Sequence, residues 1–298
     1  MLTLNPAEMP VPKVHGYLLS AIAPRPIAFA STVDEDGRPN LAPFSFFNVF
    51  SANPPVLIFS PARRGTNNTT KHTYENVNAH PEVVINIVDY AMVQQCSLAS
   101  TEYPEGVSEF EKTGLTPLES EVVKPFRVKE SPVQLECKVT DVQELGSEGG
   151  AGNLVICEVV RIHIQDRVLT PEGKIDPLKM DQVGRCGGIY YNRVDANSLF
   201  EIPKPLATVG MGVDKLPEDV RLSKVLTGND LAALATFAEL PDETDVNEYK
   251  LVELADLFIE HEDEPHVLEA KLHEMAREHV ANNQLEEAWK TLLTFNNG

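Results

Sequence analysis

Apolar and polar residues alternate over short runs in the first two-thirds of the chain, as they do in β-strands with one buried face. The run IAFASTV precedes DEDGRPN, whose Asp36-Gly37 pair is typical of a hairpin turn, and LAPFSFFNVFS follows. A long hairpin with a flexible loop, GSEGGAG, is expected later. Strands are predicted over residues 27–33, 41–51, 56–60, 83–89, 133–145 and 153–169, and short helices over 71–79 and 101–114.

The predicted strands leave little room for crossover helices between them. An antiparallel barrel or sandwich is therefore favoured over a doubly wound parallel sheet, and the fold class expected for this region is mainly β.

The apolar spacing becomes helical after residue 205. Helices are predicted over residues 230–240, 247–261, 265–280 and 285–295, and Asp230 and Pro265 are start signals for two of them. Pro203 and Pro205 interrupt regular structure between the two regions. We expect a β domain over residues 1–204 and an α-helical extension over residues 205–298.

The net charge of −20 is unevenly distributed between these regions. Residues 1–204 carry 18 Lys and Arg against 25 Asp and Glu, whereas residues 205–298 carry 7 against 20. This balance argues against nucleic acid and anionic membrane surfaces as partners. The four cysteines form no CxxC pair, no long apolar run predicts a membrane span, and the first residues do not resemble a signal peptide. A reduced, cytoplasmic protein is expected.

The segment over residues 37–74 contains no Asp or Glu, although the chain has 45 acids in 298 residues. It ends in SPARRGTNNTTKHT, which offers guanidinium, ammonium, hydroxyl and amide donors near a predicted helix start. Such donors hold phosphate groups. The glycine spacing of a P-loop is missing, and a solvated basic loop is the alternative interpretation. The missing acids favour an anion site.

Four phenylalanines lie within seven residues of the strand LAPFSFFNVFS. Core packing explains aromatic residues in a strand without any ligand. A planar aromatic ligand lying along the strand would use the same composition, with backbone groups meeting its polar edge.

Other candidate sites are weaker. VGMGVDK and GGAGNLV lack the third glycine of a dinucleotide-binding turn, so that mode of binding is excluded. A metal site at His261 and His266 is not expected, and His163, Cys137 and Cys157 fit structural positions in strands. Because no acid–base constellation is apparent, no catalytic side chain is predicted, and a cofactor would carry any chemistry.

The ordered set PRPIA, DGRPNLAPFS, NPP and KHT resembles the flavin reductase-like family of FMN-binding split barrels, over about residues 12–195. The resemblance implies a six-stranded, Greek-key-like antiparallel split barrel that forms a homodimer, with FMN in a cleft between the subunits. It also implies an oxidoreductase that passes hydride from NADH or NADPH to the flavin. A flavin-binding protein without turnover, serving storage or regulation, and a module for another phosphorylated ligand are the alternatives.

The resemblance implies binding residues in three segments. The strand and turn beside the isoalloxazine correspond to Ala42, Pro43, Phe44, Ser45, Phe46 and Asn48. The phosphate loop begins at Ser60 and corresponds to Arg63, Asn67, Thr69, Lys71 and Thr73. Arg25, Ser31 and Thr32 are expected near the ribityl chain or phosphate, and Tyr190 near the cleft, as part of RCGGIYYNR.

Two departures from the family pattern leave alternatives open. His72 replaces the Asp that many members have between Lys and Thr, and it either adds a donor or faces solvent. The helical extension lies outside the family core. It covers the cleft, extends the dimer, forms an acidic interaction surface, or simply packs as a solvated appendage.

Overall fold

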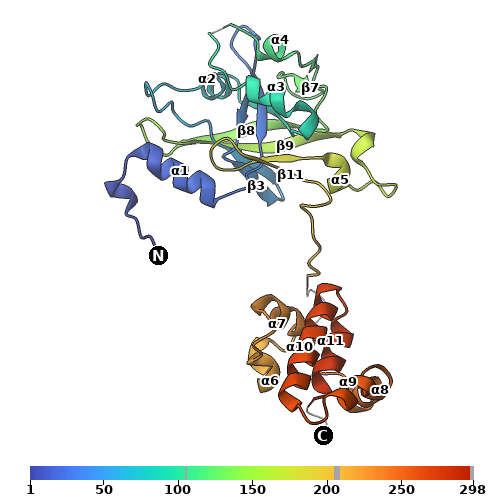
Figure 1. Cartoon of the computed structure of the whole chain (residues 1–298). Helices are drawn as coiled ribbons and strands as arrows, with labels where there is room; N and C mark the ends of the chain where they lie inside the picture. The colour runs from blue at the N-terminus through green and yellow to red at the C-terminus, as the bar shows by residue number, and fades with distance from the viewer. Residues whose placement is uncertain (105, 205–208, 296–298) are drawn as a thin grey trace. The chain divides into compact units, whose positions relative to one another are not determined.

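The computed structural model describes the whole chain except residues 105, 205–208 and 296–298 (Figure 1). It contains two compact units, Met1–Phe200 and Glu201–Gly298. The predicted start of the helical extension, residue 205, lies outside the described residues. None of the helices in the described part of the chain is long and apolar enough to cross a membrane.

The first unit is built on a seven-stranded antiparallel sheet in the order β2-β1-β5-β8-β9-β4-β3. The antiparallel arrangement was predicted, but the sheet has seven strands instead of six. Its strands are β1 (Ala28–Val33), β2 (Pro39–Phe44), β3 (Phe47–Ala52), β4 (Pro55–Phe59), β5 (Glu82–Asn86), β8 (Val133–Glu144) and β9 (Asn153–Ile164).

The prediction of one strand over residues 41–51 is wrong, because the chain breaks at Ser45 and Phe46 into β2 and β3. These two strands are the opposite edges of the sheet. In a flat sheet seven strands wide the edges would be about 29 Å apart. Phe44 and Phe47 are separated by three chain steps, which span at most about 11 Å. The sheet therefore curls until its two edges approach each other at this break.

The curled sheet separates two apolar cores, and β1 contributes to both by strict alternation. Phe29 packs with residues of helical segments, such as Met92 and Phe110, on one face. Ala28 and Ala30 face the other core, where Phe44 and Phe59 lie with ring centroids 5.6 Å apart. Cys137 and Cys157 are buried in this second core, as predicted.

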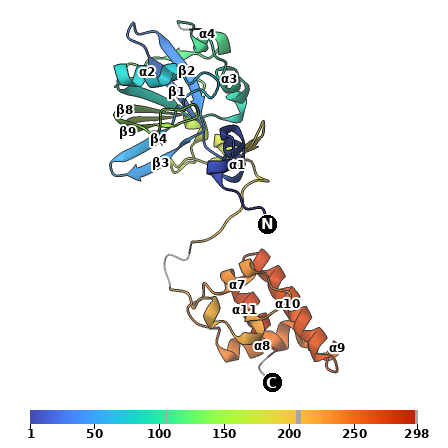
Figure 2. The same ribbon diagram turned by 90° about the vertical axis from the view of Figure 1, so that its left-hand side faces the viewer.

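Short helices complete the first unit. Figures 1 and 2 show α2 and α3 on either side of β1 and β2. Helix α2 packs through Val77 on the core of Ala28 and Ala30, whereas α3 and α4 pack on the core of Phe29. The prediction of α2 is confirmed, whereas only the second half of the predicted helix over 101–114 is helical. The N-terminal helix α1 was not predicted. The helices are η1 (Pro6–Glu8), α1 (Val11–Ala21), α2 (His72–Ala79), η2 (Tyr90–Met92), α3 (Val93–Leu98), α4 (Glu109–Thr113), η3 (Asp166–Val168) and α5 (Pro177–Met180).

Two small ladders flank the main sheet. One pairs β6 (Pro117–Leu118) with β7 (Arg127–Val128), and the other pairs β10 (Val183–Arg185) with β11 (Tyr191–Arg193). The second ladder is joined to the chain before β1, because the backbones of Arg25 and Arg185 exchange hydrogen bonds of 2.9 and 2.8 Å.

A buried carboxylate fixes the loop before β7. Glu136 is fully buried and accepts hydrogen bonds from the N–H groups of residues 121–123 and from His163, whose Nε2 lies 2.7 Å away. Burial alone would raise the pKa of Glu136, but these donors outweigh burial and lower it. Its contribution to folding is therefore present above the ordinary Glu range and is lost as the pH falls through the lowered pKa. The structural role predicted for His163 is confirmed.

In the second unit, every regular element among the described residues is a helix. Thr227 and Asp230 form a reciprocal capping box at α7, and Pro265 occupies the first turn of α10, as the start signals predicted. The core is centred on Trp289, whose Nε1 donates to the carbonyl of Leu234 at 3.1 Å. The helices are η4 (Val213–Lys215), α6 (Glu218–Arg221), α7 (Gly228–Leu234), α8 (Glu243–Glu253), α9 (Ala255–Glu260), α10 (Pro265–Ala281) and α11 (Leu285–Leu293).

Candidate functional site

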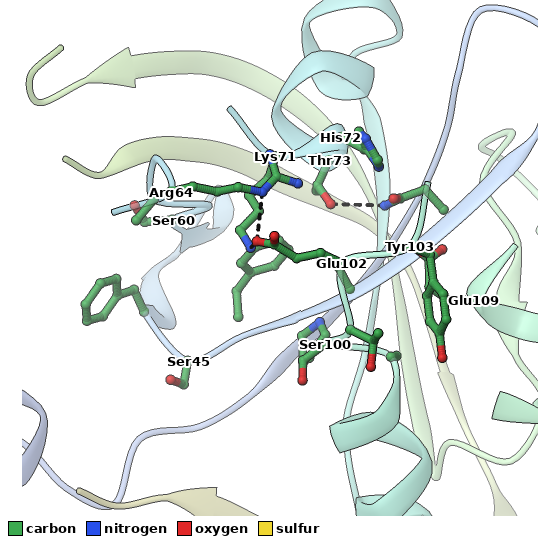
Figure 3. A pocket seen from close by; sticks show the side chains of 18 of the residues that line it. Ser45, Ser60, Arg64, Lys71, His72, Thr73, Ser100, Glu102, Tyr103 and Glu109 are labelled. Carbon is green, nitrogen blue, oxygen red and sulfur yellow. Dashed lines mark hydrogen bonds and ion pairs between the residues drawn. The ribbon is translucent and has the colours of Figure 1, made fainter. Parts of the chain in front are cut away.

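A cleft of about 280 Å³ opens in the first unit where β2 breaks into β3 (Figure 3). The segment 42–46 lines one side, and the loop after β4 with the start of α2 lines another. Residues 99–103, after α3, and His15 and Leu19 of α1 complete the wall. The curl of the sheet brings these segments together, although 94 positions of the sequence separate His15 from Glu109 at its extremes.

Two cations define one end of the cleft. Arg64 is held by its own loop, since its guanidinium donates to Thr69 Oγ1 at 3.0 Å and to the carbonyl of Thr70. Lys71 is the residue immediately before α2. Both side chains are mostly shielded, with exposed fractions of 14% for Arg64 and 33% for Lys71. Their charges therefore act in a partly desolvated place, where hydrogen bonds to an anion are stronger than on the open surface.

Hydroxyl and backbone donors surround the same end. Ser60 Oγ is buried, lines the cleft and has no hydrogen-bond partner among the described residues. Thr73 Oγ1 accepts from Asn40 Nδ2 at 3.0 Å, which leaves its own proton available to a ligand. The first N–H groups of α2 have no intrahelical acceptors, as at every helix start. The set has the chemistry of an anion site.

An acid from outside the acid-free segment neutralises these cations. Glu102 Oε1 lies 2.9 Å from Arg64 Nε and 3.6 Å from Lys71 Nζ (Figure 3). The hydrogen bond from Arg64, and then the charge of Lys71, lower the pKa of Glu102 below its usual range. The carboxylate is 59% exposed and belongs to a connecting loop, so it can be displaced without unfolding the sheet.

A second acid, Glu109, lines the cleft at the start of α4 and is buried. Its Oε2 accepts the backbone N–H of Leu41 at 3.0 Å, which ties α4 to the edge strand β2. Burial raises the pKa of Glu109, and this N–H opposes the shift. Its geometry identifies it as a residue that positions β2 along the cleft.

Eight of the sixteen predicted binding residues line the cleft. They come from the strand and turn before β3 and from both ends of the basic loop: Ala42, Pro43, Phe44, Ser45, Phe46, Ser60, Lys71 and Thr73. His72, left open by the sequence, also lines it.

The middle of the basic loop lies outside the cleft wall. Arg63 Nε donates to Asn68 Oδ1 at 2.8 Å, so this guanidinium braces the loop. Asn67 Oδ1 accepts from the N–H and the hydroxyl of Thr69 in a local turn. Asn48 is exposed on the edge strand β3. The structure therefore does not bring the predicted binding residues Arg63, Asn67, Thr69 and Asn48 to the cleft.

The remaining predicted residues are also apart from the cleft wall. Arg25 is buried and donates to the carbonyls of residues 19, 22 and 186. Ser31 is buried in β1 without a hydrogen-bond partner in the described chain. Thr32 lies behind the wall, where Asn40 and Asn76 donate to its hydroxyl. Tyr190 is 71% exposed in the turn between β10 and β11.

Several residues that line the cleft were not predicted from the sequence. Arg64 stands beside the predicted Arg63 in the same acid-free run, and only the loop conformation decides which guanidinium reaches the cleft. Glu102, Glu109 and His15 carry no local signal, because they arrive from distant segments. No group of three or more His, Cys, Asp or Glu in the described chain is arranged to hold a metal ion.

The antiparallel sheet of the first unit agrees with comparisons to known proteins. The sequence profile described as "Flavin reductase like domain" matches residues 20–192, which is more than half of the chain. An uncharacterized protein from Aquifex aeolicus is 38% identical over 178 residues, covering 60% of this chain and 88% of that protein.

Two solved structures resemble the first unit. Nitrilotriacetate monooxygenase component B from Bacillus cereus is 32% identical, with a TM-score of 0.63, and the match covers 68% of this chain and 98% of that one. A protein from Shewanella frigidimarina, described as a candidate flavin reductase with a split barrel domain, is 27% identical with a TM-score of 0.56, covering 66% of this chain and 95% of that one. The chain therefore belongs to the flavin reductase-like domain family.

Proposed function

We propose that this protein binds FMN in the cleft and uses it to accept hydride from NADH or NADPH. The observation that carries the proposal is the convergence of Ser60, Arg64, Lys71 and Thr73 at one end of a cleft whose side is the segment 42–46. Family membership supports a flavin as the ligand.

The residues present fit the phosphate of FMN. This phosphate carries close to two negative charges at neutral pH, and the net charge of the protein repels it at long range. Arg64 and Lys71 supply two local charges, and the buried hydroxyl of Ser60 supplies a donor that has no other partner in the described chain. Gly152 leaves room for this hydroxyl, since a Cβ there would lie 2.8 Å from Ser60 Oγ.

The rest of the cleft fits the ring system. Ala42, Pro43 and Phe44 end the edge strand β2, and their backbone beside Ser45 is open to the polar edge of a flat ligand. The curled sheet with its edges meeting at this break is, in the proposal, the split barrel of the family. The flavin supplies the hydride acceptor, while the protein binds the phosphate, orients the ring and shields it from water.

Anaerobic addition of NADH and NADPH to the flavin-loaded protein tests this function. Bleaching of the flavin absorbance by either nucleotide supports the oxidoreductase. A stable yellow protein that neither nucleotide bleaches supports the alternative, flavin binding without turnover. A protein that takes up no FMN at all overturns the proposal. The remaining hypothesis is then that the cleft binds another phosphorylated ligand.

Glu102 should compete with the phosphate of FMN, because both use Arg64 and Lys71. Because exposed ion pairs are weak, Glu102→Gln is expected to tighten FMN binding only modestly, roughly two- to fivefold. Riboflavin, which lacks the phosphate, should bind the variant and the parent equally. Weaker FMN binding by Glu102→Gln would show that the carboxylate organises the site instead of competing for it. Titration of flavin fluorescence measures all four affinities.

A homodimer belongs to the same proposal. Helix α1 buries none of its residues; Tyr17 and Leu18 on it are 44% and 53% exposed, and Ile22, just after it, is 63% exposed. Val49 and Phe50 on the edge strand β3 are also exposed, at 63% and 64%. A second copy that covers these side chains would complete the open side of the cleft. Sedimentation of a flavin-loaded monomer at micromolar concentration would contradict the dimer.

A further inference from the structure

A second hollow of about 270 Å³ adjoins the cleft. Pro43, Ser45 and Ser100 line both spaces, and Pro43 and Ser45 belong to the chain segment that is expected beside the flavin ring. The far wall comes from α3 and from the β10–β11 ladder, which contribute Ser97 and Arg185. The hollow is therefore placed where a second substrate would meet the flavin.

The hollow is acid-free and contains one permanent charge. No Asp or Glu is among its lining residues, and Arg185 has no carboxylate within ion-pairing distance in the described chain. Its guanidinium lies over the ring of Tyr191, 4.6 Å from the centroid, and Nη2 donates to the carbonyl of Gly188 at 3.1 Å. In a chain of net charge −20, a guanidinium left without an acid is an attractive partner for an anion.

The surroundings reinforce the positive potential. The buried Arg25 donates to three backbone carbonyls and also lacks a carboxylate in the described chain. Burial, and then the positive charge of Arg185, lower the pKa of Arg25. The hydroxyls of Ser45 and Ser97 add neutral donors at the wall of the hollow, whereas that of Ser100 donates to the carbonyl of Ser97. An anionic oxygen in the hollow would relieve the repulsion between the two guanidiniums.

Arg185 is carried by a rigid segment. The backbone of Arg185 exchanges two hydrogen bonds with Arg25, and β10 pairs with β11. Gly184 is packed so closely that a Cβ would lie 2.9 Å from Pro24 Cβ and 3.2 Å from the carbonyl oxygen of Arg25. A guanidinium held on such a segment loses little conformational freedom when it binds a ligand.

We propose that the Arg185 hollow binds the negatively charged group of the second substrate, a phosphate or carboxylate-like oxygen set on a molecule that exchanges electrons with the flavin. This inference rests on the proposed function, because it assigns the partner of the same site. Two molecules have the required chemistry: the nicotinamide nucleotide that donates hydride, and an anionic acceptor that removes electrons from the reduced flavin.

The test compares Arg185→Gln with the parent, with Arg185→Lys as the charge-retaining variant. Arg193→Gln is the matched control, because Arg193 belongs to the same ladder but is ion-paired with Asp181 at 2.6 Å. Calorimetry measures NAD⁺ binding to the oxidised protein. Steady-state assays measure KM for NADH, for a sulfonated naphthoquinone and for the same quinone without the sulfonate. FMN affinity is measured for every variant.

Arg185→Gln is expected to weaken one anionic ligand about tenfold, as loss of one charged hydrogen bond predicts. A loss for NAD⁺ and NADH identifies the nucleotide, and a loss confined to the sulfonated quinone identifies the acceptor. The neutral quinone should be unaffected, Arg185→Lys should recover part of the loss, and Arg193→Gln should behave as the parent.

Two results would overturn the inference. Equal affinities of parent and Arg185→Gln for all anionic ligands exclude an anion site in the hollow. A loss of FMN affinity in Arg185→Gln comparable with that of Lys71→Ala places Arg185 in the flavin site instead. A protein that binds no FMN would refute the proposed function, but not by itself the anion site. Calorimetry with NAD⁺ on the parent and on Arg185→Gln would then still show whether Arg185 binds an anion.

Discussion

Arg64→Ala and Lys71→Ala should each weaken FMN binding about tenfold, and the double variant up to about a hundredfold. Hydrogen bonds to charged groups contribute about 1.5–3 kcal/mol, and tenfold in affinity corresponds to about 1.4 kcal/mol. Both side chains are mostly shielded at the cleft, so solvent weakens these bonds less than on an open surface. Fluorescence titration with FMN and riboflavin measures the effect, which riboflavin should not show.

Two control variants sharpen this prediction. Lys138→Ala removes the same charge from an exposed position on β8 and should leave FMN affinity unchanged. Arg63→Ala separates the neighbouring arginines, because Arg63 braces the loop through Asn68 and does not line the cleft. It should weaken FMN binding less than Arg64→Ala does. Equal affinities of the parent for FMN and riboflavin would refute a phosphate site in this loop.

Trp289→Ala should unfold or severely destabilise the helical unit while FMN binding persists. The indole is fully buried, and its removal costs about 3–5 kcal/mol, a large share of the 5–15 kcal/mol that typically stabilises a domain. The two units have separate apolar cores, so the loss should stay within Glu201–Gly298. Far-ultraviolet circular dichroism on heating should show an earlier helical transition, with the FMN affinity within about twofold of the parent.

The matched control for this variant is Leu251→Ala on α8, where the side chain is 75% exposed. It should change the free energy of unfolding by no more than about 0.5 kcal/mol. If Trp289→Ala leaves the sheet unit folded but without FMN, the helical unit contributes to the flavin site, and the proposal that the two parts are separable fails.

Local chemistry made much of this protein predictable. The apolar runs IAFASTV and LAPF form β1 and β2, and Asp36-Gly37 lies in the turn between them. Every residue of β1 is buried, and its alternation divides them between the two cores. The helical spacing after residue 205, with Asp230 and Pro265 at helix starts, predicts the second unit. The proposed anion site was indicated by the absence of Asp and Glu over residues 37–74, because carboxylates in the same segment would compete with an anion for its donors.

The composition of the cleft depended on tertiary structure. The sequence shows Arg63 and Arg64 as equivalent neighbours, and the loop conformation turns one guanidinium inward and the other onto Asn68. Likewise, a break of two residues sends β2 and β3 to opposite edges of the sheet, where periodicity predicted one strand.

The sequence by itself determined the antiparallel sheet, the helical extension, the family and the basic segment that lines one end of the cleft. Only the tertiary structure decided that Glu102 sits on Arg64 and Lys71 and that Glu109 supports β2. It also decided that Arg185, beside the cleft, has no ion-paired acid among the residues that the structure describes. The physical reason is the distance along the chain over which each kind of interaction acts. Periodicity, turns and caps act between residues a few positions apart, whereas charge pairing across a cleft depends on how the curled sheet brings distant loops together.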